Sequence, residues 1–209
     1  MLNKIPFSQA SGLLREGDIL LFRGSGWVSS LIQRASEGRY SHVGVASAYI
    51  YGDDIIWECV EFREWKGGRS VNLQKYVEMN DGNIDVYRPS SSKKIADYVD
   101  GKVVERTVKY NGHGVTKTMR LMTGLPYGWT RILWIAQHKL PLIRTIYDIN
   151  LVVNDTLQDL VYPVCSTAVS YSCAKNDWDL THHRADAWME PSDVARSALI
   201  HYVFTLVTG

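Results

Sequence analysis

The sequence lacks the features that mark several large classes of protein. Its 209 residues include only three cysteines, an odd number with no C-x-x-C pair, which fits neither a disulfide framework nor a zinc knuckle and suits a reducing compartment. The 23 basic and 22 acidic residues give a net charge of +1, so bulk charge offers no reason to expect binding to nucleic acid. No repeat, low-complexity tract or linker divides the chain. The remaining expectation is one globular domain, with 45% hydrophobic residues for its core.

Long uninterrupted hydrophobic runs and a readable export signal are also missing. The apolar segment 129–147 is broken by Arg131, Lys139 and Arg144, whereas a bilayer span needs ~20 mostly uncharged residues. We therefore expect no transmembrane span, and a packed or interfacial helix pair within a helical insertion at about 129–162. The start of the chain has no apolar signal-peptide core and no small-residue cleavage site, which predicts synthesis in the cytoplasm.

Short hydrophobic runs bounded by turn residues predict a sheet in the first half of the chain. Expected strands cover 17–23, 40–46, 55–61, 69–71 and 84–87, with a last strand at 201–207. The turn residues at 52–54 predict that the second and third strands form an antiparallel hairpin. Expected helices cover 27–37, 73–79, 91–110 and 115–123. Two further helices are expected to begin near Cys165 and at Pro191. The pattern predicts the α+β class, with helices covering an antiparallel sheet.

Cys165 is the first candidate functional residue. Pro163 disfavours helix at the residue before it, and the small, apolar residues from Cys165 onward predict a buried helix that begins there. Unpaired N–H groups and the positive end of a helix dipole stabilise a thiolate, as does a nearby imidazolium. Cys165 is therefore either a reactive thiol or, as we expect for Cys173, a buried structural cysteine.

His42 and Glu58 are candidate partners for that thiol. His42 begins a strand that otherwise consists of core residues, and Glu58 lies on the returning strand of the hairpin. Because side chains alternate along a strand, Glu58 shares a face with Val60, and Cys59 lies on the opposite face. We predict that Glu58 accepts the imidazole N–H and orients His42 as a general base. Glu61 is the next carboxylate to examine if Glu58 does not take this role.

Several blocks of the sequence, in a fixed order, resemble a known family. They are Gly17-Asp18-Ile19-Leu20-Leu21-Phe22, Ser41-His42-Val43-Gly44-Val45, Glu58, Gly124-Leu125-Pro126-Tyr127, Val164-Cys165-Ser166 and Pro191-Ser192-Asp193-Val194-Ala195-Arg196-Ser197. Together they resemble the circularly permuted NlpC-type papain-like proteins, which include the YiiX-like bacterial proteins and, more remotely, lecithin retinol acyltransferase. The resemblance implies a single permuted papain-like domain over 1–209, whose antiparallel sheet or half-barrel packs against helices. It also implies a nucleophile at a helix N-terminus.

The same resemblance implies a cysteine peptidase or amidase that forms an acyl-enzyme without a cofactor. Cys165 would be the nucleophile, His42 the base and Glu58 the orienter. Tyr40 and Tyr127 are candidates to line the substrate cleft, with core packing as the alternative. The expected substrates are peptide or acyl amides and esters, with cell-wall peptides of peptidoglycan first. Lipid esters or amides, processed by an acyltransferase or esterase of the same fold, come second.

Two other interpretations stay open. The first is a non-catalytic binding or structural protein of a phage virion that keeps the fold, because a fold does not fix a function. The second is a metal site built from Cys165, Cys173, His182 and His183, although their spacing matches no usual zinc pattern. Many bacterial relatives carry an export or lipoprotein signal, and none is readable here. A cytoplasmic or virion-associated location is therefore expected.

Overall fold

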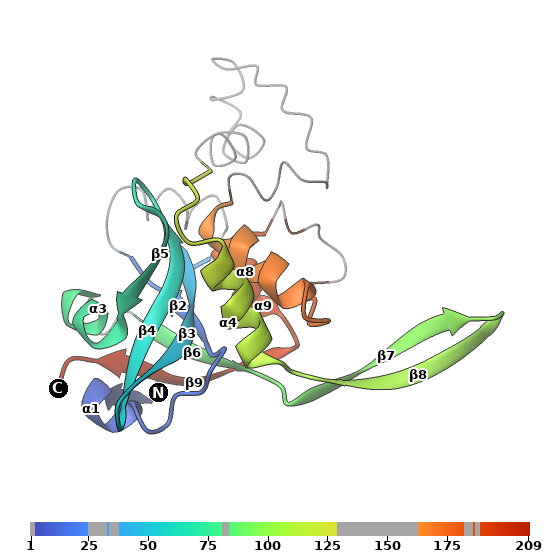
Figure 1. The fold of residues 1–209 in the computed structure, drawn as a ribbon, viewed down its shortest axis with the longest axis horizontal. Helices are drawn as coiled ribbons and strands as arrows, with labels where there is room; N and C mark the ends of the chain where they lie inside the picture. Colours follow the sequence, from blue (N-terminus) through green and yellow to red (C-terminus); the bar gives the residue numbers. More distant parts are fainter. Residues whose placement is uncertain are drawn as a thin grey trace, which may run out of the picture.

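A seven-stranded sheet forms the centre of the protein in the computed structural model (Figure 1). The structure describes residues 3–24, 33, 38–80, 84–128, 163–181, 186 and 189–209. The strand order is β1-β9-β6-β2-β3-β4-β5, and neighbours are antiparallel except for β1 and β9, which are parallel. The strands are β1 (Lys4–Pro6), β2 (Ile19–Phe22), β3 (His42–Tyr51), β4 (Asp54–Arg63), β5 (Gly67–Asn72), β6 (Ile84–Pro89) and β9 (Ile200–Val207). The expected α+β class with a mainly antiparallel sheet is confirmed.

The hairpin of β3 and β4 is the part of the sheet that matters most for the site. Every residue of the neighbouring β2 is buried, which places β3 beside the centre of the sheet. Gly52 has a positive φ of 61° in the turn between β3 and β4, a conformation that glycine adopts without steric cost. Tyr51 pairs with Asp54 directly across this turn, and the antiparallel register continues to Gly44 and Glu61. The predicted hairpin is confirmed.

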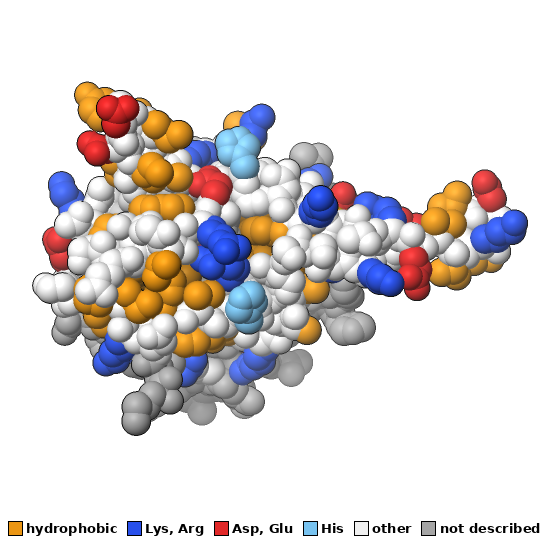
Figure 2. All heavy atoms as spheres, turned by 90° about the horizontal axis from the view of Figure 1, so that it is seen from below, with side chains coloured by type: hydrophobic (Ala, Val, Ile, Leu, Met, Phe, Trp, Pro, Cys, Tyr) orange, Lys and Arg blue, Asp and Glu red, His pale blue; other side chains and the backbone are white. Residues whose placement is uncertain are grey.

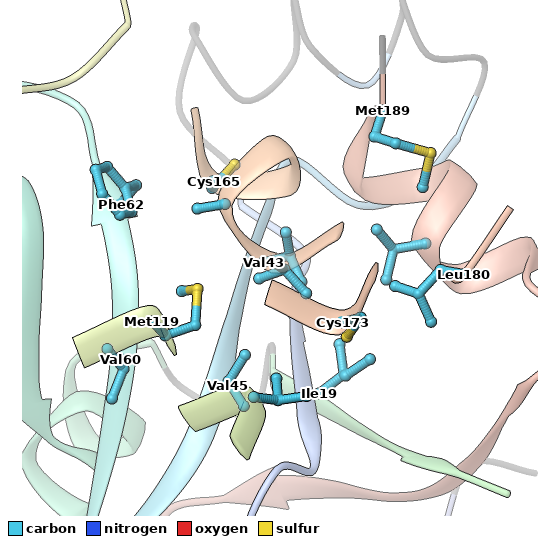
Figure 3. Packing of buried hydrophobic residues seen from close by; sticks show 14 of the residues in the cluster. Ile19, Val43, Val45, Val60, Phe62, Met119, Cys165, Cys173, Leu180 and Met189 are labelled. Carbon is cyan, nitrogen blue, oxygen red and sulfur yellow. The ribbon is translucent and has the colours of Figure 1, made fainter. Parts of the chain in front are cut away.

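Helices cover both faces of the sheet. On one side lie α4 (Gly112–Leu121), α8 (Cys165–Ala174) and α9 (Pro191–Arg196), and on the other lie α1 (Phe7–Ala10) and α3 (Leu73–Asn80) (Figure 1). Alternating side chains of β3 and β4 therefore enter two different cores. Figure 3 shows the core between the sheet and α4 and α8, with Val43, Val45 and Val60 from the strands facing Met119 and Cys173 from the helices.

Residues 91–110, predicted as a helix, instead form a β-hairpin. Its strands are β7 (Ser92–Val99) and β8 (Lys102–Lys109), which pair with each other and extend away from the body as an arm (Figure 1). Asp100 and Gly101 between them have positive φ angles of 49° and 76°. An Asp-Gly pair between strand-forming residues favours this turn, and here the turn outweighs the local signals that predicted a helix over 91–110.

Most of the other described helices agree with the sequence. Helix α3 covers the segment predicted at 73–79, α4 overlaps the one predicted at 115–123, and α8 and α9 begin at Cys165 and Pro191, whereas α1 was not predicted. The helix expected at 27–37, apart from residue 33, and the insertion expected at about 129–162 lie outside the described residues. Within the described ranges, no helix combines the length and apolar character that a membrane crossing requires.

Candidate active site

Cys165 is the first residue of α8. The preceding Val164 is extended, with φ −95° and ψ 170°, and its carbonyl accepts the N–H of Ala168 at 2.9 Å as the first backbone bond of the helix. The N–H groups at the start of a helix have no acceptor within it, so they surround the Cys165 backbone with donors. The side chain is buried, with 4% of the residue exposed, and lies at the edge of the core drawn in Figure 3.

His42, the first residue of β3, is bound to Glu61 of β4. Their Nε2 and Oε2 atoms are 2.5 Å apart, and both side chains are buried. Gly44 stands directly opposite Glu61, so His42 lies diagonally across from it on the same face of the hairpin. A Cβ at Gly44 would lie 3.3 Å from the Glu61 Cβ and 2.7 Å from the Cys59 Sγ, so glycine keeps this space open.

Two more side chains hold the Glu61 carboxylate. Arg69, its direct partner on β5, donates to Oε1 from Nε at 2.8 Å and from Nη2 at 2.6 Å. The Tyr76 hydroxyl, from α3, lies 2.8 Å from Oε2 and 3.1 Å from Oε1. A buried carboxylate with three side-chain partners is held in one place, and it fixes the imidazole that it binds.

The His42–Glu61 pair is held in its charged form. Burial on its own lowers the pKa of His42, but the charge of Glu61 and the nearby Cys165 sulfur outweigh it and raise that pKa above its ordinary value. Burial on its own raises the pKa of Glu61, but His42 and Arg69 lower it below its ordinary value. The second ring nitrogen, Nδ1, is buried and makes no regular hydrogen bond to the described atoms. It is the nitrogen left for a reacting group.

Tyr127 also lies beside Cys165. Burial, and next the charge that the Cys165 sulfur would carry, raise the pKa of Tyr127 well above its ordinary value, so its hydroxyl stays protonated. Tyr127 is itself buried, with 7% of the residue exposed. The structure thus brings the sulfur of Cys165, the imidazole of His42 and the phenol of Tyr127 together.

Glu58 is not beside His42, and the sequence-based placement is wrong. It stands opposite Ser47, five residues further along β3 than His42, and its Oε2 accepts from Arg120 Nη2 at 2.5 Å. The turn fixes this register, because Tyr51 pairs with Asp54 and each step back along β3 is one step forward along β4. The sequence offered this signal in the turn residues Gly52 and Asp53. The acidic partner of His42 is Glu61, the carboxylate that sequence analysis placed second.

Tyr40, predicted to line the cleft, takes part in a buried hydrogen-bond network around Asp85. Its hydroxyl donates to Asp85 Oδ2 at 2.7 Å and lies 3.0 Å from the Tyr87 hydroxyl. Asp85 is fully buried and also accepts from Arg23 at 3.0 Å and from Thr205 at 2.5 Å. These contacts anchor the chain two residues before His42. Tyr40 and Cys165 belong to the same hydrophobic cluster.

The other two thiols are buried and unfavourable as thiolates. Burial, and next the charge of Glu61, raise the pKa of Cys59 well above its ordinary value. Burial, and next the charge of Asp186, raise the pKa of Cys173. Strand parity relative to Glu58 was the predicted reason to exclude Cys59. Cys59 lies on the same face of β4 as Glu61, so parity does not exclude it. Its burial and the negative charge of Glu61 make it a poor thiolate instead.

A separate open groove of about 630 Å³ lies between β3 and α4. It contains neither Cys165 nor His42, and its lining includes Arg120, the partner of Glu58. Glu16 also lines the groove and accepts hydrogen bonds from the Ser47 hydroxyl at 3.0 Å, from the Ala48 N–H and from the Thr116 hydroxyl. The groove is therefore not part of the Cys165 site.

Comparison with known proteins supports the fold. No family model matches the sequence, and no curated protein matches it. Among solved structures, the chain is similar to the metalloprotein YiiX from Escherichia coli O157:H7, with 13% sequence identity and a TM-score of 0.55 over 91% of this chain and 97% of that one. At this identity the likeness shows a YiiX-like fold alone. Within the described ranges, no three His, Cys, Asp or Glu side chains lie together as metal ligands, and His182 and His183 lie outside these ranges.

Proposed function

We propose that this protein is a cysteine hydrolase of the permuted NlpC-type papain-like kind. The observation that carries the proposal is a buried imidazole bound to Glu61 on one side and next to Cys165 on the other. Cys165 is the nucleophile, His42 the acid and base, and Glu61 the residue that orients His42. This constellation of nucleophile, base and orienter is the one that acyl transfer needs.

The chemistry follows from these positions. A charged imidazole beside Cys165 favours the thiolate form of a cysteine, and the thiolate attacks the carbonyl carbon of an amide or ester. As the tetrahedral intermediate collapses, His42 donates its proton to the leaving nitrogen or oxygen, and an acyl group remains on the Cys165 sulfur. Water, or another acyl acceptor, then loses a proton to His42 and attacks this thioester, which frees Cys165.

Two groups would stabilise the charge that develops on the carbonyl oxygen. The N–H groups at the start of α8 include that of Cys165 and have no acceptor within the helix. The Tyr127 hydroxyl, protonated and next to Cys165, is a second donor at the same place.

The proposed substrates are amides of cell-wall peptides first, and lipid esters or amides second. The resemblance of the ordered sequence blocks to the permuted NlpC-type family supports this order.

Acyl transfer to Cys165 can be tested without knowing the substrate. We would expose the protein to p-nitrophenyl acetate and locate added acetyl groups by intact mass and peptide mapping. The wild type should carry one rapidly formed acetyl group on Cys165, and Cys173→Ala should behave like it, whereas Cys165→Ala should carry none at that rate. Slow, scattered acetylation that is the same in all three proteins would favour the non-catalytic binding protein instead. Digestion of peptidoglycan with release of free amines would then identify the first substrate class.

A further inference from the structure

The β7–β8 arm has little contact with the rest of the protein. Its strands pair with each other and with no other described strand. Its root is attached: Val108 is buried, Ile95 packs against the hydrophobic core of the body, Lys93 Nζ lies 5.2 Å from the centre of the Trp178 ring, and Arg106 Nη1 lies 3.8 Å from Asp177 Oδ2. Beyond this root, the arm stands in solvent (Figure 1).

The far half of the arm exposes a group of apolar side chains. Tyr98 is 76% exposed, Val99 51%, Val103 68% and Val104 48%. Figure 2 shows hydrophobic side chains at the far end of the arm, among charges of both signs. A two-stranded ribbon on its own is marginally stable in water, and its unpaired edges are templates for a further strand. A second chain that covered this arm would stabilise it.

The turn fixes which backbone groups point outward. Val99 and Lys102 flank the two-residue turn, whose positive φ angles are those of a type I′ turn, and residues that flank such a turn form a hydrogen-bonded pair. Because this pattern alternates, the N–H and C=O groups of Lys94, Ala96 and Tyr98 point away from β8. They form the unpaired edge of β7 within the described structure.

That edge is complementary to itself. If two copies of β7 run antiparallel about Ile95, each Lys93 stands opposite Asp97 of the other copy, and the two Ile95 residues stand opposite each other. All three residues lie on one face of the strand, since they are two residues apart. Asp97 Oδ2 also accepts from Arg106 Nε at 2.5 Å in its own arm, so Lys93 would be a second cation beside that carboxylate. Opposite charges directly across a sheet are favourable. The corresponding registers of β8, centred on Glu105 or Arg106, would instead place like charges opposite each other.

We propose that the arm joins two copies of this chain through their β7 edges. The two hairpins then form one four-stranded antiparallel sheet around a two-fold axis at Ile95. In this register Tyr98 of one copy stands opposite Ser92 of the other, so each exposed tip reaches the root of the partner arm. Tyr98 on β7 thereby gains a neighbour in the second copy, whereas Val103 and Val104 lie on the outer strand β8.

Proline substitutions on the two edges give a matched test. In Ala96→Pro the lost N–H is one that points away from β8, so the hairpin can form but its β7 edge cannot pair. Glu105→Pro makes the same change on the outer edge of β8. Sedimentation velocity over a range of concentrations should show a dimer for the wild type and for Glu105→Pro, and a monomer for Ala96→Pro. A wild type that stays monomeric, or equal effects of the two prolines, would overturn the proposal.

Charge reversal tests the register without proline. Lys93→Asp places two like-charge pairs in the interface, and should weaken the dimer by about tenfold. Asp97→Lys should do the same, and the double variant should recover most of the wild-type affinity. If the double variant dimerises no better than either single variant, the two residues do not face each other. Circular dichroism of each variant separates loss of the dimer from loss of the fold.

Discussion

His42 Nε2 lies 2.5 Å from Glu61 Oε2, and both side chains are buried between strands β3 and β4. Arg69 and Tyr76 hold the same carboxylate from the other side. Glu61 therefore cannot swing away from the imidazole without breaking its hydrogen bonds to Arg69 and Tyr76. This arrangement leaves the second ring nitrogen of His42, Nδ1, for a reacting group, which in the proposed mechanism is Cys165.

Replacing Glu61 should slow acyl transfer, and replacing Glu58 should not. Glu61→Gln keeps a hydrogen-bonding side chain but removes the charge that raises the pKa of His42. The loss should be smaller than that of His42→Ala, since removing a general acid–base costs about 10²–10⁴-fold. Glu58→Gln is the matched control, because Glu58 is bound to Arg120 and not to His42. Acetylation rates of Cys165 in the three variants measure this, and a slow Glu58→Gln beside a normal Glu61→Gln would return the orienting role to Glu58.

The ion pair should stabilise the fold most strongly in weakly acidic solution. Glu61 has a lowered pKa, so its contribution is fully present above its ordinary value of about 4.3 and is lost as the pH falls through the lowered one. His42 has a raised pKa, so its contribution is fully present below about 6.5 and is lost as the pH rises through the raised one. The difference in unfolding free energy between wild type and Glu61→Gln should be larger near pH ~5.5 than near pH ~10. Urea unfolding at both pH values tests the sign, and a difference that grows with pH would contradict it.

A methyl group at Gly44 should disturb the site through Cys59. The added Cβ would lie 2.7 Å from the Cys59 Sγ, too close for an undisturbed contact. Crowding of this kind in a core costs about 1–3 kcal/mol. Gly44→Ala should therefore lower the unfolding free energy, and it should cost less when Cys59→Ala is already present. A double-mutant cycle by urea unfolding measures this, and equal costs in the two backgrounds would assign the strain to the backbone around Val60.

The sequence predicted the nucleophile helix and the hairpin, but not the acidic partner. A proline shortly before a run of small residues locates the start of α8 at Cys165, because both signals are local. The choice between Glu58 and Glu61 depends on strand register, because a shift of one residue moves every side chain of the strand to the other face. Gly52 and Asp53 form the two-residue turn that sets this register. Alternation alone could identify which residues share a face, but not which of them faces His42.

The arm shows a second limit of sequence reasoning. Residues 91–110 were predicted as a helix covering the sheet, whereas the structure has two strands around Asp100 and Gly101. The Asp-Gly turn was the local signal for a hairpin. Tyr40 shows a third limit, since its binding to Asp85 joins residues far apart in the chain, and no local pattern encodes such a contact.

The reactivity of the three thiols tests the central claim most directly. Alkylation by iodoacetamide, followed against pH and assigned by peptide mapping, compares Cys165 with Cys59 and Cys173 in one sample. Both comparison thiols are buried and have raised pKa values, so they should label slowly while the protein is folded. Cys165 should label fastest near neutral pH, and His42→Ala should shift its labelling to higher pH, because the neighbouring cation is then lost. A Cys165 that labels as slowly as Cys59 and Cys173, or whose pH profile does not respond to His42→Ala, would contradict the account.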